Sequence, residues 1–112
     1  MLFRSSAPTE LVFTDLPEPV RRRVPEYMTD VPLTWRIVDP GCRTVDEVIA
    51  AGAGAGGLVV WDAPVTAEVI EGLPALRIIA VPYVGADHLA LDAAQRNGVW
   101  VTNVPEIGRA HV

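Results

Sequence analysis

The sequence predicts an α/β protein: a doubly wound parallel sheet of five strands with helices on both faces. Two observations support this fold class. Short apolar runs alternate with helix-like segments along the whole chain, which is the order that right-handed βαβ units produce. Each run is also largely apolar rather than alternating, as expected for strands buried on both faces of a parallel sheet.

The expected strands are rich in valine, leucine and isoleucine. They cover residues 11–14, 34–38, 58–61, 76–81 and 99–103. The carboxyl ends of such strands meet at one edge of the sheet, where folds of this kind bind their ligands. The loops that follow each strand are therefore the places to look for a site.

Four helices are expected between the strands, over residues 19–28, 44–51, 66–71 and 87–97. The first begins with a proline, and the next two begin at Thr44 and Thr66, which are plausible N-caps. Asp87 is the expected N-cap of the last helix, and Gly98 is expected to end it. The expected architecture is a flavodoxin-like fold forming one domain over residues 1–112.

Composition excludes several classes of protein. The net charge is −5 and the pI is about 4.8, so the chain would repel a phosphate backbone and we expect no nucleic-acid partner. Apolar stretches are too short to span a membrane. Cys42 is the only cysteine, which favours the cytoplasm and a packing role. The run Arg21–Arg23 is interpreted as a solvated helix face.

A glycine-rich segment matches the dinucleotide-binding pattern G-x-G-x-x-G through Gly52, Gly54 and Gly57. That pattern binds a pyrophosphate only when a strand precedes it and a helix follows it. Here the expected helix precedes the glycines and the expected strand follows them. We therefore expect these glycines to turn the chain into the sheet, not to bind a cofactor.

Three aspartates stand where expected strands end: Asp15, Asp39 and Asp62. Their simplest role is to cap the turns that follow. An alternative is a receiver-type signalling module, with Asp62 as phosphoryl acceptor and Asp15 near a metal. That chemistry needs a lysine after the fifth strand, and the chain has no lysine. A freestanding ligand-binding or dimerisation module is a further alternative.

The stretch from Leu76 to Val112 reads LRIIAVPYVGADHLALDAAQRNGVWVTNVPEIGRAHV. It resembles the D-isomer-specific 2-hydroxyacid dehydrogenases in the order of its parts. An apolar strand leads to a turn at Val84, Gly85 and Asp87. A helix of the D-A-A-x-x-x-G kind and a strand ending in V-T-N-x-P follow. The upstream piece WDAPVTAEVIEGLPALRIIA is also similar to this family.

The resemblance implies that main-chain N–H groups at Val84 and Gly85 hold the carboxylate of a 2-hydroxy or 2-oxo acid. Tyr83 stands where many members have glycine, and it would line the substrate pocket. The family's catalytic histidine lies far downstream, so His111 does not match it. The resemblance further implies an NAD(P)-dependent, cytoplasmic, homodimeric parent enzyme. The 112 residues would be its substrate domain, cut before the nucleotide-binding domain and inactive alone.

Overall fold

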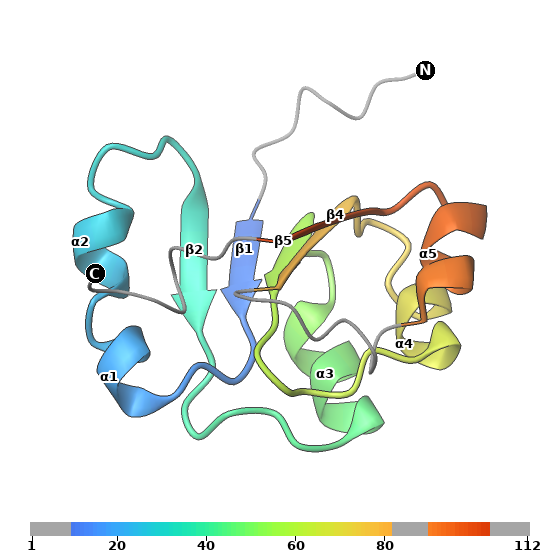
Figure 1. Cartoon of the computed structure of the whole chain (residues 1–112), viewed down its shortest axis with the longest axis horizontal. Helices are drawn as coiled ribbons and strands as arrows, with labels where there is room; N and C mark the ends of the chain where they lie inside the picture. The colour runs from blue at the N-terminus through green and yellow to red at the C-terminus, as the bar shows by residue number, and fades with distance from the viewer. Residues whose placement is uncertain (1–9, 82–89, 104–112) are drawn as a thin grey trace.

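The computed structural model describes residues 10–81 and 90–103. Ten elements follow one another in these ranges (Figure 1). They are β1 Glu10–Phe13, α1 Glu18–Arg21, α2 Val24–Tyr27, β2 Thr34–Ile37, α3 Val45–Gly52, β3 Gly57–Val59, α4 Ala67–Glu71, β4 Ile78–Val81, α5 Leu91–Arg96 and β5 Trp100–Asn103. The strands form one sheet in the order β2-β1-β3-β4-β5, and every neighbouring pair is parallel. The expected fold class is confirmed, because this is the flavodoxin-like order.

Helices pack on both faces of the sheet, as expected. Alternate strand residues point to opposite faces, so Val12, Leu58 and Ile79 join α3, α4 and α5 in the larger core. Phe13 and Val59 point the other way and join the smaller core with α1 and α2. In Figure 1, α1 and α2 lie beside β2, and α3 to α5 lie on the other side of the strands.

The expectation of one helix over residues 19–28 is wrong. The segment forms two four-residue helices, α1 and α2, and the second has Pro25 in its first turn. Proline has no N–H to donate, and its ring collides with the carbonyl four residues earlier, so it cannot continue a helix. Val24 is fully buried, whereas Tyr27 is exposed with the Arg23 guanidinium 5.4 Å from its ring centroid.

The last helix also starts later than expected. Its N-cap is Ala90 and its first residue is Leu91, and the expected N-cap, Asp87, lies outside the described residues. The expected end is confirmed, because Gly98 follows the helix with φ of +70°. The N-caps of the two central helices are confirmed as well. Thr44 and Glu47 form a reciprocal capping box, and the Thr66 hydroxyl accepts the Val69 N–H.

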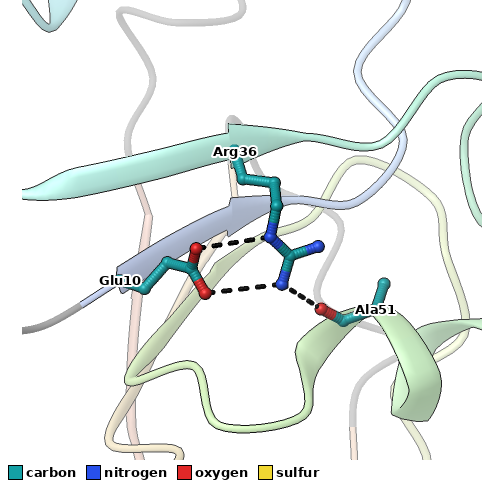
Figure 2. Close-up of polar contacts among 3 residues, drawn as sticks. All are labelled: Glu10, Arg36 and Ala51. Atoms are coloured by element: carbon teal, nitrogen blue, oxygen red, sulfur yellow. Dashed lines mark hydrogen bonds and ion pairs between the residues drawn. The ribbon is translucent and has the colours of Figure 1, made fainter.

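The strands are not all buried on both faces. β2 is an edge strand, and its Arg36 side chain is exposed on the α3 side of the sheet. Figure 2 shows this guanidinium pairing with both carboxylate oxygens of Glu10, at 3.3 and 3.4 Å, and donating to the Ala51 carbonyl at 2.7 Å. On the opposite face, Ile78 of β4 and Trp100 of β5 are exposed. Hydrophobic composition alone did not distinguish central strands from edge strands.

Candidate functional site at the carboxyl edge of the sheet

The carboxylate of Asp15 joins the ends of two neighbouring strands. It accepts the Trp61 N–H at 2.9 Å and the Asp62 N–H at 2.6 Å, both just beyond β3. It also accepts the Thr14 hydroxyl at 2.8 Å. Because β1 and β3 flank the point where the sheet reverses its winding, Asp15 fixes the turn at the usual ligand-binding position of such folds.

The loop after β2 packs tightly on the same residue. A Cβ on Gly41 would lie 2.7 Å from the Asp15 Cα, so only glycine fits there. The next residue, Cys42, donates its N–H to the Thr14 carbonyl at 2.7 Å. The loops after β1, β2 and β3 therefore form one connected wall around Asp15.

A cavity of about 380 Å³ opens between these three loops. Asp15 comes from the first loop, Gly41 to Arg43 from the second, and Asp62 to Pro64 from the third. Asp62 and Arg43 are exposed, and Asp15 is half-buried. The cavity thus has one positively charged side chain, Arg43, and one exposed carboxylate, Asp62. The Asp15 carboxylate already accepts two backbone N–H groups.

Cys42 is among the residues that line this cavity, and it is buried. Burial raises the pKa of the Cys42 thiol above its usual value, and the charges of Glu47 and Asp15 raise it further. The neutral thiol is a poor nucleophile, so a packing role fits better than a catalytic one.

The three predicted substrate residues, Tyr83, Val84 and Gly85, lie outside the described residues, as does Asp87. The residues on either side of that segment are described. Val81 ends β4 and is buried, and Ala90 donates its N–H to the Val65 carbonyl at 3.0 Å. This hydrogen bond connects the residue that follows the segment, Ala90, to Val65, which lies shortly after Asp62 on the same edge of the sheet.

Asp39 and the run Arg21–Arg23 take part in ion pairs of two kinds, one between elements and two within single helices. Asp39 forms an ion pair with Arg21 at 3.7 Å, linking the loop after β2 to α1. Arg22 and Arg23 are exposed and pair with acids of their own helices, Glu18 and Glu26. The solvated-face interpretation therefore suits Arg22 and Arg23 but not Arg21. Sequence reasoning missed Arg43 as a cavity residue, although its place two residues after Pro-Gly at a strand end was a usable signal.

The glycine pattern does not fit a dinucleotide. Gly52 ends α3, Gly54 has φ of +82°, and Gly57 begins β3. The pattern thus lies at the amino end of β3, at the opposite edge of the sheet from Asp15. A Cβ on Gly57 would lie 2.6 Å from Leu11 Cδ2, so this glycine allows close side-chain packing.

Two other features are absent from residues 10–81 and 90–103. No group of three or more metal-binding side chains comes together there. No helix in those ranges is long and apolar enough to cross a membrane.

The strand order and the cavity between the loops after β1, β2 and β3 define a doubly wound α/β domain with a cavity at the edge of the sheet where such folds bind ligands. The family model described as "D-isomer specific 2-hydroxyacid dehydrogenase, catalytic domain" matches residues 11–112. The chain belongs to this family of oxidoreductases, and the resemblance seen in the sequence is confirmed.

Two curated relatives share 43% identity with the chain. One is a glyoxylate reductase of Korarchaeum cryptofilum, over 44 residues, covering 39% of this chain and 13% of the relative. The other is a D-3-phosphoglycerate dehydrogenase of Mycobacterium bovis, over 61 residues, covering 54% and 12%. The alignments span about an eighth of each relative's length.

The fold is also that of a solved structure in this family. The NAD⁺-bound 3-phosphoglycerate dehydrogenase of Entamoeba histolytica superposes with a TM-score of 0.75 at 19% identity. The superposition covers 88% of this chain and 33% of that chain. At this identity the likeness establishes the fold.

These findings disfavour a receiver-type module. The Asp15 carboxylate, which would lie near a metal in that chemistry, is held by two backbone N–H groups and a hydroxyl. The fifth strand carries Thr102 and Asn103 at its end, where a receiver needs lysine.

Proposed function

We propose that this chain is the substrate-side part of an NAD(P)-dependent oxidoreductase acting on the CH–OH group of a D-2-hydroxy acid. The family match over residues 11–112 carries this proposal. The main-chain N–H groups of Val84 and Gly85 would hold the substrate carboxylate, and Tyr83 would line the pocket. The placing of Val81 and Ala90 at the carboxyl edge supports this assignment, because both flank the assigned residues.

The nucleotide-binding part would belong to a longer parent protein. The relatives are several times longer than the aligned segments, and the Entamoeba enzyme was solved with NAD⁺. The glycine pattern of this chain lies at the wrong edge of the sheet for a dinucleotide. The 112 residues alone would therefore neither bind NAD(P) strongly nor turn over substrate. We place the parent in the cytoplasm as a homodimer acting on a small 2-hydroxy or 2-oxo acid.

Two measurements on the purified chain test this proposal. Incubation with NADH and glyoxylate or hydroxypyruvate should produce no NADH oxidation, and detectable oxidation would refute the assignment of catalysis to another part of the parent. In an amide NMR titration with hydroxypyruvate, the signals of Val81 and Ala90 should shift while those of Gly54 stay in place. Glycerol, which lacks the carboxylate, is the matched control ligand. Equal shifts with glycerol, or none at millimolar hydroxypyruvate, would contradict carboxylate binding at this edge.

A further inference from the structure

The cavity at the carboxyl edge of the sheet lies beside the segment to which we assign the substrate carboxylate. The loop after β3 contributes Asp62, Ala63 and Pro64 to its wall. β3 pairs in parallel with β4, and the Val60 N–H just beyond β3 donates to the Ala80 carbonyl of β4 at 2.9 Å. Neighbouring strands lie about 4.8 Å apart, so the loops after β3 and β4 leave the sheet side by side. An acid held by its carboxylate after β4 would extend its other end toward this cavity.

Two internal carboxylates already take backbone donors of this cavity. Asp15 accepts the Trp61 N–H through Oδ1 at 2.9 Å and the Asp62 N–H through Oδ2 at 2.6 Å. Glu47 accepts the Arg43 N–H at 2.6 Å. Phosphate sites in proteins are built largely from such backbone N–H groups in loops and at helix starts. In this cavity the two-point contact that a bound phosphate would make is made by Asp15.

The charged side chains around the cavity also disfavour a phosphate. Asp15 and Asp62 contribute two carboxylates, and Arg43 contributes the one guanidinium among the lining residues. A phosphate with two negative charges would therefore meet two like charges and one opposite charge. A neutral hydroxyl group meets no such repulsion. Its oxygen can accept from the Arg43 guanidinium, and its hydrogen can be donated to the Asp62 carboxylate.

We propose that this cavity receives the end of the substrate remote from its carboxylate, and that Asp15 and Asp62 exclude a phosphate from it. The substrate is then an unphosphorylated D-2-hydroxy acid with a short, neutral, polar end, such as the hydroxymethyl group of D-glycerate. The volume of about 380 Å³ is ample for such a group. Asp62 is the specificity-determining residue, because its exposed carboxylate faces the incoming group. The placing of the substrate rests on the proposed function, whereas the exclusion of phosphate rests on the cavity alone.

Amide NMR titrations of the chain with D-glycerate and with 3-phospho-D-glycerate test the selectivity, because the two acids differ only by the phosphate. D-glycerate should shift the Ala63 and Ala90 signals, and the phosphorylated acid should bind roughly tenfold more weakly or worse. Asp62→Asn should narrow this difference by about threefold to tenfold, because it removes one negative charge beside the phosphate. Asp30→Asn is the matched control. It removes an equal, exposed charge in the turn before β2, at the opposite edge of the sheet, and should leave the ratio unchanged.

An anion-rescue measurement tests the role of Asp15 without any substrate. Asp15→Ala removes the acceptor of the Trp61 and Asp62 N–H groups. Acetate or inorganic phosphate should therefore raise the urea midpoint of this variant and shift its Asp62 amide signal, whereas chloride at equal ionic strength should not. The unchanged chain should show neither effect, because its own carboxylate occupies the position. Should Asp15→Ala fail to fold by circular dichroism, the phosphate titration of the unchanged chain and the Asp62→Asn ratio still decide.

Three results would overturn the inference. The first is binding of 3-phospho-D-glycerate as tight as that of D-glycerate. The second is a shift of the Asp62 and Ala63 amides of the unchanged chain by millimolar inorganic phosphate, and the third is no anion rescue in a folded Asp15→Ala variant. Failure of D-glycerate to bind would count against the proposed function and the placing of the substrate. The phosphate titration would then still decide whether the cavity excludes phosphate, so the two proposals fail distinguishably.

Discussion

The carboxylate of Asp15 accepts the backbone N–H of Asp62 at 2.6 Å, across 47 positions of sequence. This contact joins the carboxyl ends of β1 and β3, and it connects through Val65 and Ala90 to the segment that the family resemblance assigns to substrate. The Asp15 carboxylate therefore holds the backbone of Trp61 and Asp62 in place. We regard it as a positioning residue of the carboxyl edge.

Asp15→Ala removes three hydrogen bonds to one carboxylate and leaves the N–H groups of Trp61 and Asp62 without it. We expect the free energy of unfolding to fall by about 1.5–3 kcal/mol, the range for bonds to a charged group. Asp15→Asn keeps one acceptor oxygen and should cost less. Urea denaturation measures both. Asp62→Asn, at an exposed side chain, is the control and should change stability by less than about 0.5 kcal/mol. A loss no larger than that control would show that the contact does not hold the turn.

Gly41→Ala should destabilise the chain more than Gly54→Ala. The new Cβ at position 41 would lie 2.7 Å from the backbone Cα of Asp15, which cannot move without separating the two loops. Overpacking of this kind costs about 1–3 kcal/mol. At Gly54 nothing lies within 4 Å, so the cost is only the positive φ of +82°, about 1–2 kcal/mol. Denaturation midpoints of the two variants give the order, and the reverse order would contradict the close approach at Asp15.

Thr44→Ala should lower stability by about 0.5–2 kcal/mol, the usual cost of losing an N-cap side chain. The hydroxyl accepts the Glu47 N–H at 3.1 Å, and the Glu47 carboxylate accepts the N–H groups of Arg43 and Thr44. Because these bonds support one another, Thr44→Ala and Glu47→Ala together should cost less than the sum of the separate changes. A double-mutant cycle by urea denaturation measures this coupling, and strict additivity would argue against the capping box.

The Cys42 thiol should react slowly with a disulfide reagent near neutral pH and rapidly once urea unfolds the chain. Its pKa is raised in the folded state, chiefly by burial. The unfolded thiol therefore ionises first as pH rises. The stability that Cys42 contributes is fully present below the unfolded-state pKa and is lost as pH rises toward the folded-state value. Cys42→Ala should remove this alkaline component from the stability profile. Equal thiol reactivity with and without urea would rule out burial as the cause.

Much of the fold was predictable because its signals are local. Apolar runs located all five strands, and Thr44 and Thr66 marked helix starts through bonds to residues three positions away. The order of helix and strand around Gly52 and Gly57, the reverse of a dinucleotide-binding turn, was also predictable and is confirmed. The single helix expected over residues 19–28 was wrong because Pro25 has no N–H to donate and lies in the first turn of a second helix.

The sequence by itself determined the fold class, the family and the edge of the sheet at which we propose that the substrate binds. These follow from periodicity, turn chemistry and the order of short patterns, all of which act between near neighbours. Only the tertiary structure decided that Asp15 holds Trp61 and Asp62 and that Gly41 must be glycine. It also decided that β2, with the exposed Arg36, and β5, with the exposed Trp100, are the two edges of the sheet. Those contacts join residues far apart in the chain. They depend on strand order and register, which no local pattern encodes.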